Sequence, residues 1–270
     1  MSPELGRTSE AASEQDGLVR SPSRTDSFAA VLALASAMAW VVMVGIGGWP
    51  RFLVAAVLAL GGLEGLRRGN RDAAALALAT AAVATLMALR IRVIWPGELL
   101  AVVGGLLVAY RFKVPWFRRG VMNGAIVAWS CAVVMISAGA LLAWWAIFHP
   151  DLTDLAFPPW LRSLHPAVIA LLLLGWASLN AVAEEFFYRG AMQHALVEAI
   201  GPAGVLVQAM AFGVAHLHGV PRGAIGVVLA TIYGLMMGAL RVRARGMLAP
   251  WAAHVVADVV VVAILAVGTR

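Results

Sequence analysis

The sequence SLHPAVIALLLLGWASLNAVAEEFFYR at residues 163–189 decides the fold class. Its first 21 residues, 163–183, contain no Asp, Glu, Lys or Arg. About 20 consecutive apolar residues span the hydrocarbon core of a bilayer as an α-helix. The run therefore predicts a transmembrane helix, and this helix leads directly into two adjacent carboxylates, Glu184 and Glu185.

The whole chain has the composition that this segment implies. Hydrophobic residues make up 62% of its 270 residues and charged residues 13%, whereas a soluble domain has roughly 45–50% apolar and about 25% charged residues. So few charges cannot cover the surface of a soluble globule of this size. The composition therefore predicts an integral membrane protein that lies in a lipid bilayer.

Charged residues divide the rest of the chain into apolar stretches. Besides 163–183, the stretches without Asp, Glu, Lys or Arg are 27–50, 52–63, 73–89, 99–110, 120–150, 199–221 and 223–240, and 246–269 is broken only by Asp258. They predict an all-α fold, a polytopic transmembrane bundle of eight or nine helices. We expect residues 1–25 to form a disordered cytoplasmic tail, residues 26–160 the N-terminal transmembrane helices, and residues 161–270 the transmembrane helices that carry the functional site.

Basic residues alternate in number from loop to loop. The N-terminal tail has three, the 67–72 loop three, the 111–119 loop four and the 241–246 loop three, while the loops between them have one or two. Because basic residues gather in cytoplasmic loops, we expect a multi-pass protein of the cell (plasma) membrane with a cytoplasmic N-terminus. The net charge of +6 comes from these basic loop residues, which the membrane topology explains. We therefore expect no nucleic-acid partner.

Two other features have structural interpretations. The single cysteine, Cys131, lies in an apolar stretch and is expected to be a buried, inert thiol. Glu64 is followed by Arg67 and Arg68 at three and four residues, which predicts a salt bridge on the surface of a helix.

The remaining charged residues within the apolar segments need a functional reason, because each costs at least about 2.5–3.5 kcal/mol at the bilayer centre. Glu185 and Arg189 are four residues apart, and this spacing predicts an ion pair on one face of a helix. Adjacent helical residues diverge by about 100°, so Arg189 cannot serve both carboxylates equally. Glu184 is therefore left as a candidate general base.

Two histidines and an aspartate lie in other apolar segments. His216 follows Phe212 by four residues, and His254 precedes Asp258 by four, so that His254 and Asp258 share a face of the last helix. His216 alone is typical of a hydrogen-bonded core histidine, and His254 with Asp258 is also compatible with a simple helix-stabilising bond. Since ionisable groups inside a membrane usually mark function, we expect these residues and Glu184 to share one pocket.

The motifs Glu184-Glu185-x-x-x-Arg189, Phe212-x-x-x-His216 and His254-x-x-x-Asp258 resemble those of the CAAX-protease and bacteriocin-processing family, the Abi or Rce1-like group of intramembrane proteases. The resemblance covers about residues 160–268 and would make 161–270 the catalytic part of the chain. It implies an endopeptidase that hydrolyses a peptide bond in a membrane-associated protein or peptide. Because eukaryotic members cleave a C-terminal tripeptide after a prenylated cysteine, a prenylated, CAAX-type substrate is one that the resemblance implies.

The resemblance also implies roles for the residues of the motifs. It assigns water activation to Glu184 with His216, stabilisation of the oxyanion to His254 and Asp258, and structural support to Glu185, Arg189 and Phe212. An ionised Asp258 cannot donate to an oxyanion. Either Asp258 is protonated in its apolar site, or it accepts from His254 and holds that ring in its donor tautomer; we favour the second.

Other chemistries are compatible with the same residues. Glu184, His216, His254 and Asp258 are candidate zinc ligands, since two histidines and a carboxylate with water form a common catalytic set, but the chain lacks H-E-x-x-H and we expect no required cofactor. A non-catalytic membrane scaffold or immunity protein of the same family is one alternative function. A proton-coupled transporter is another, because intramembrane Glu, His and Asp also form proton relays.

Overall fold

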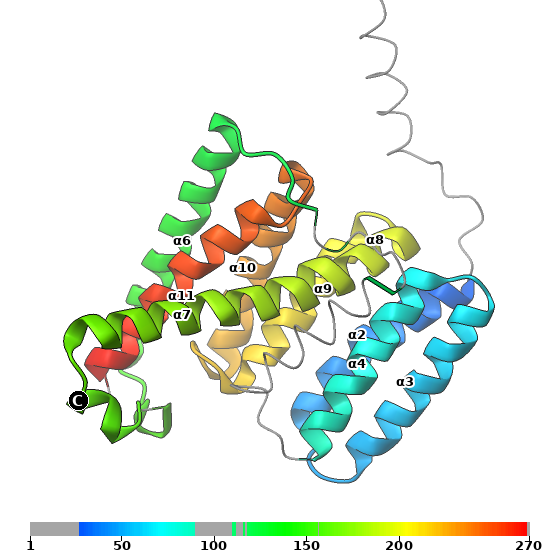
Figure 1. Cartoon of the computed structure of the whole chain (residues 1–270), viewed down its shortest axis with the longest axis horizontal. Coiled ribbons are helices and arrows are strands. Elements are labelled where there is room, and N and C mark those ends of the chain that lie inside the picture. The colour runs from blue at the N-terminus through cyan, green and yellow to red at the C-terminus, as the bar shows by residue number, and fades with distance from the viewer. Residues whose placement is uncertain (1–26, 90–109, 112–115, 117, 156, 269–270) are drawn as a thin grey trace, which may run out of the picture.

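The computed structural model describes residues 27–89, 110–111, 116, 118–155 and 157–268, and within these ranges the chain forms eight helices and no strand (Figure 1). The predicted all-α bundle of eight or nine helices is thereby confirmed. The tail at 1–25 lies outside the described residues, and so does the apolar stretch 99–110 apart from Tyr110. The helices are α2 (Ser27–Gly45), α3 (Pro50–Arg67), α4 (Arg71–Ala88), α6 (Gly124–Phe148), the long helix Pro166–Ile200, α9 (Ala203–Ala215), α10 (Gly223–Ala244) and α11 (Leu248–Gly268).

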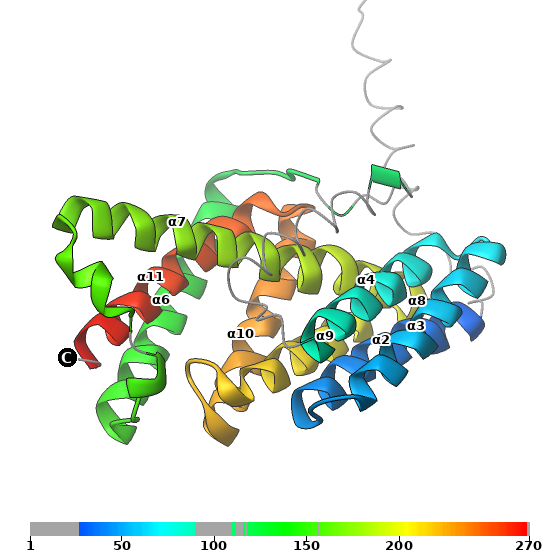
Figure 2. The same ribbon diagram turned by 60° about the horizontal axis from the view of Figure 1, so that its bottom comes forward.

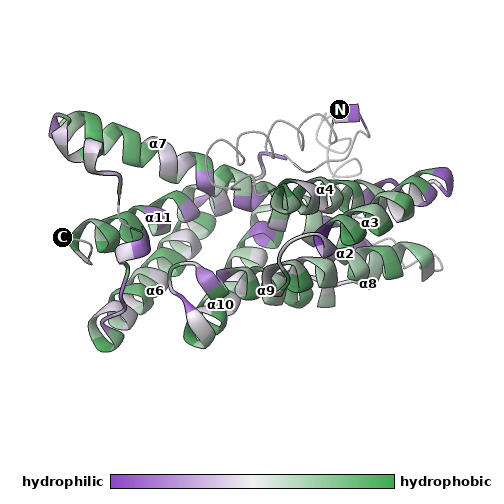
Figure 3. Cartoon of the chain, turned by 90° about the horizontal axis from the view of Figure 1, so that it is seen from below, coloured by the Kyte–Doolittle hydropathy of each residue, from purple (hydrophilic) through white to green (hydrophobic). Residues whose placement is uncertain are grey.

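Five of these helices are long and apolar enough to cross a membrane: α4, α6, the long helix Pro166–Ile200, α10 and α11. Hydrophobic residues cover most of the length of the helices in Figure 3. A helix of about 20 residues is sufficient to span the bilayer core. The five spans therefore indicate a multi-pass membrane protein.

The helices form two groups joined by the long helix. The group of α2, α3 and α4 lies on one side, α6, α10 and α11 lie on the other, and the long helix runs between them (Figure 1, Figure 2). Between the groups, α9 packs against α10, α8 and α2. The largest hydrophobic cluster joins α2 and α4 to the long helix and α9, so the N-terminal helices cover the half of the long helix that follows Glu184.

The long helix consists of three parts: α7 (Pro166–Glu184), a π-helical segment η3 (Glu185–Met192) and α8 (Gln193–Ile200). Its second half carries several polar residues, and apart from the exposed Glu198 these face the protein. Gln193 is fully buried, and His194 Nε2 lies 3.0 Å from Oδ1 of Asp72 at the start of α4. Contacts with α4 for His194 and with the backbone of Gly238 in α10 for Gln193 therefore explain how this half tolerates polar side chains.

Small residues bring α9 and α10 into close contact. A Cβ atom on Gly213 would collide with the Thr231 hydroxyl and lie 2.6 Å from the carbonyl oxygen of Val227. Only glycine lacks the Cβ atom that would meet these groups. This contact lies directly before His216, so it sets the position of that histidine relative to α10.

The two structural predictions have different outcomes. Glu64 forms the expected salt bridges, at 2.8 Å to Arg67 and 2.7 Å to Arg68. The prediction that Cys131 is buried is wrong, because this residue is exposed on α6. Helix α6 packs on one side only, and its other side, with Cys131, faces the surroundings of the protein.

Candidate active site

The structure brings residues from distant motifs together around His254 of α11. Glu184 ends α7, Glu185 begins the π-helical segment, and His254 lies between them and Asp258, one turn further along α11. Asp258 and Glu185 are buried, while the Glu184 side chain is 27% exposed. Three carboxylates therefore surround one imidazole.

The π-helical segment gives Glu185 and Arg189 their direction. In this segment the N–H of Gln193 donates to the carbonyl oxygen of Tyr188, five residues earlier. Short π-helical insertions of this kind are rare and occur frequently at functional sites. Here the insertion points both Glu185 and Arg189 into the protein, where their side chains are 1% and 0% exposed.

The predicted ion pair between Glu185 and Arg189 is confirmed. Nη1 of Arg189 donates to Oε1 of Glu185 at 2.8 Å. The guanidinium carbon of Arg189 also lies 4.3 Å from the centre of the Phe212 ring, which it faces. Phe212 thus contributes a cation–π contact that ties α9 to the ion pair.

His254 makes its hydrogen bond with Glu185. Nδ1 of His254 lies 2.7 Å from Oε1 of Glu185, and since the ion-paired carboxylate only accepts, Nδ1 is the donor. Nε2 lies 3.5 Å from Oε2 of Glu184 and 3.6 Å from Oδ1 of Asp258. The favoured interpretation of Asp258 as the acceptor from His254 is corrected here, because 3.6 Å is too long for a hydrogen bond and Glu185 takes that role.

Asn180 connects the two remaining carboxylates. Its Nδ2 donates to Oδ2 of Asp258 at 3.0 Å and to Oε1 of Glu184 at 3.5 Å. The sequence reasoning missed Asn180 because it followed charged residues. The available signal was its position four residues before Glu184, on the same face of an otherwise apolar helix.

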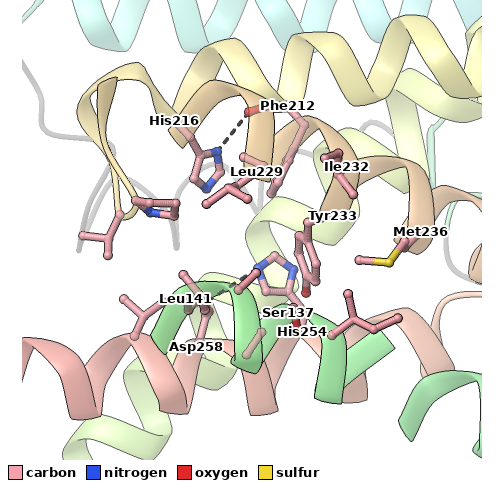
Figure 4. Close-up of a pocket in the computed structure, with 17 residues that line it drawn as sticks. Ser137, Leu141, Phe212, His216, Leu229, Ile232, Tyr233, Met236, His254 and Asp258 are labelled. Carbon is pink, nitrogen blue, oxygen red and sulfur yellow. Dashed lines mark hydrogen bonds and ion pairs between the residues drawn. The ribbon is translucent and has the colours of Figure 1, made fainter. Parts of the chain in front are cut away.

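His216 faces a cavity of about 90 Å³ whose lining includes Phe212, His216, Tyr233, His254 and Asp258 (Figure 4). Nδ1 of His216 lies 2.9 Å from the carbonyl oxygen of Phe212. A carbonyl only accepts, so Nδ1 carries the proton, and in the neutral ring Nε2 is an acceptor. The expected shared pocket thus contains His216, His254 and Asp258. Glu184 is not among the residues that line it, and its sharing of a water molecule with His216 stays a prediction.

Tyr233 is a second residue that the sequence reasoning missed. Its ring lies 5.6 Å from that of His254 in an edge-to-face arrangement. Its hydroxyl is buried and makes no hydrogen bond to any residue in the described part of the chain. A buried hydroxyl normally has a partner, so this donor is available to a group that enters the cavity.

The candidate zinc ligands do not form a metal site. No group of three or more His, Cys, Asp or Glu side chains among the described residues is arranged to hold a metal ion. The donor set therefore does not fit a three-ligand zinc centre, and the zinc alternative gains no support.

Comparison with protein families identifies the part of the chain that contains the site. Residues 166–260 match the model of the family described as type II CAAX prenyl endopeptidase Rce1-like. The matched segment contains all three motifs, so the resemblance seen in the sequence is confirmed for this domain. Comparisons with curated proteins and with solved structures gave no match.

Proposed function

We propose that this protein is an intramembrane endopeptidase that hydrolyses a peptide bond in a membrane-associated protein or peptide. The observation that carries the proposal is the cluster of Glu184, Glu185 and His254, which lies beside a cavity within a helical bundle. The family match supports the same class of reaction. The eukaryotic substrates implied by the resemblance make a prenylated, CAAX-type protein the first substrate to test.

In the proposed reaction Glu184 is the general base. It takes a proton from a water molecule, whose oxygen attacks the carbonyl carbon of the scissile bond. Its carboxylate is suited to this role because Arg189 neutralises Glu185 rather than Glu184. His216 assists from the cavity, where the acceptor Nε2 of its neutral ring can hold the same water molecule. The proton then passes to the leaving amine as the carbon–nitrogen bond breaks.

His254 is proposed to stabilise the oxyanion. Its Nδ1 is held by Glu185, so Nε2 is the atom that faces the reaction, and it donates when the ring carries a second proton. Asp258 and Glu184 flank Nε2, and Asn180 fixes both carboxylates. Tyr233 offers a further donor from α10.

The orientation of the protein belongs to the same proposal. The segments 118–121 and 244–248 lie side by side through backbone hydrogen bonds, and both belong to arginine-rich loops. The positive-inside tendency supports a cytoplasmic location for these loops and for the N-terminus, in the plasma membrane. A protease-accessible tag fused to the N-terminus should be cleaved only when the cytoplasmic side is exposed.

Proteomics of membrane-protein C-termini tests the function. Cells with the wild-type protein should contain truncated C-terminal peptides that are absent from cells with Glu184→Ala or His216→Ala. Glu198→Ala is the matched control, because Glu198 is exposed on the same long helix and should leave cleavage intact. If both site variants insert normally and still give the truncated peptides, the proposal is wrong.

A further inference from the structure

A second pocket, whose lining includes Glu185, lies between the long helix and the start of α11. Its volume is about 240 Å³. Val182 and Phe186 of the long helix and Leu248 and Trp251 of α11 form apolar walls, and Arg118 and Arg119 border the pocket. None of the three motifs accounts for these two arginines.

The backbone of the two arginines is fixed against α11. The carbonyl oxygen of Arg118 accepts from the N–H of Met247 at 2.8 Å, and that of Arg119 accepts from Leu248 at 3.2 Å. The next residue, Gly120, has a φ of +79° and packs directly on Gly246, where a Cβ atom on either residue would collide with the other's backbone. The segment is thus held next to the pocket, while the side chains of Arg118 and Arg119 remain exposed.

Several helix ends place this pocket at a membrane surface. Helix α6 begins at Gly124, α10 ends at Ala244 and α11 begins at Leu248, all beside the segment 118–121. The last turn of α10 carries further arginines, and the guanidinium carbon of Arg243 lies 4.5 Å from the centre of the Trp129 ring. Arginine and tryptophan gather at the boundary between lipid and water, so the mouth of the pocket lies at the level of the lipid headgroups.

Among the described residues, the side chains at this mouth carry positive charge that no acidic partner offsets. Within the described ranges neither Arg118 nor Arg119 forms an ion pair with an acidic side chain. The acidic residue of the pocket, Glu185, is 1% exposed and already bonded to Arg189 and His254. The pocket therefore combines an apolar interior with two guanidinium groups at its entrance that pair with no acidic residue in the described part of the chain.

We propose that this pocket binds one anionic phospholipid. Its phosphate lies against Arg118 and Arg119, and its acyl chain lies along Val182, Phe186, Leu248 and Trp251. Guanidinium groups suit phosphate because they donate two parallel hydrogen bonds, and basic residues at the membrane surface attract anionic lipids. This site goes beyond the proposed peptidase function and does not depend on it, since binding is measured without a substrate.

Native mass spectrometry of the purified full chain tests the proposal with phosphatidylglycerol as the probe and phosphatidylcholine as the neutral comparison. The variant Arg118→Gln/Arg119→Gln removes the phosphate contacts. Val182→Trp fills the apolar part and keeps every charge. Arg243→Gln/Arg245→Gln is the matched control, because it removes two exposed arginines from the same end of the bundle but outside the pocket. Melting temperatures in detergent identify any variant that fails to fold.

The wild-type protein should retain one phosphatidylglycerol molecule in preference to phosphatidylcholine. Arg118→Gln/Arg119→Gln and Val182→Trp should each weaken this binding at least tenfold, while the control should change it less than twofold. Inorganic phosphate should not displace the lipid, which separates a lipid site from a site for a free anion. The proposal is overturned if the control weakens binding as much as the pocket variants do, or if folded pocket variants bind as the wild type does.

Discussion

The Nδ1 atom of His254 lies 2.7 Å from Oε1 of Glu185, although the two residues are 69 positions apart in the sequence. The same carboxylate oxygen accepts from Arg189 at 2.8 Å. All three side chains are at most 4% exposed. Glu185 therefore neutralises a buried cation and fixes the ring of His254, and it joins the π-helical segment of the long helix to α11.

Glu185→Gln is expected to destabilise the protein strongly. The substitution leaves Arg189 as a buried cation without its carboxylate, which costs about 3–5 kcal/mol when one partner of a buried pair is removed. The free energy of unfolding in detergent measures this loss. The double variant Glu185→Gln/Arg189→Gln should be destabilised by less than the sum of the two single variants, because both charges are gone. Strict additivity would show that the two side chains act independently.

Asn180→Asp is expected to slow peptide cleavage while substrate binding stays nearly unchanged. The amide of Asn180 donates to both Asp258 and Glu184, and a third carboxylate there would repel both. Misplacement of a catalytic group by about 1 Å can cost about 100-fold in rate, so kcat should fall by roughly 10–100-fold with KM within about twofold. Steady-state kinetics with the substrate found by C-terminal proteomics gives both constants.

Ser178→Ala is the control for this prediction. Ser178 lies two residues before Asn180, and its contact with Trp251 uses the backbone carbonyl oxygen, which the substitution keeps. Its kinetic constants should match those of the wild type. If Ser178→Ala lowered kcat as much as Asn180→Asp does, the fall would come from a disturbance of the helix and not from the loss of the Asn180 amide.

The sequence could predict the charged part of the site because each charge stands out in an apolar segment. The four-residue spacing of Glu185 and Arg189 is sufficient for their ion pair. The same spacing was misleading for His254 and Asp258, because a partner from another helix competes for the imidazole. A local pattern cannot reveal such a tertiary partner.

Neutral polar residues and helix faces were harder to predict. Asn180 and Tyr233 carry no charge and are not distinguished by a search for ionisable groups. The π-helical segment Glu185–Met192 rotates side chains away from the positions that a regular α-helix gives. For Cys131 the reason is different, because a uniformly apolar helix has no polar face that shows which side packs inward.

Tyr233→Phe is expected to separate catalysis from stability. The substitution removes a buried hydroxyl that bonds to no described residue and keeps the ring next to His254. The melting temperature should therefore stay the same or rise. If the hydroxyl donates to the oxyanion, kcat should fall by about 100-fold or more, as for other donors of this kind. An unchanged kcat in the folded variant would remove Tyr233 from the mechanism.

Gly213→Ala is expected to separate α9 from α10 and displace His216. The added methyl group would collide with the Thr231 hydroxyl and lie 2.6 Å from the backbone oxygen of Val227, which cannot move without α10. Overpacking of this kind costs about 1–3 kcal/mol, so unfolding in detergent should occur at a lower temperature, with a loss of cleavage. Gly175→Ala is the control, since its Cβ atom would meet nothing within 4 Å. Equal behaviour of the two variants would mean that the contact between α9 and α10 is looser than the structure describes.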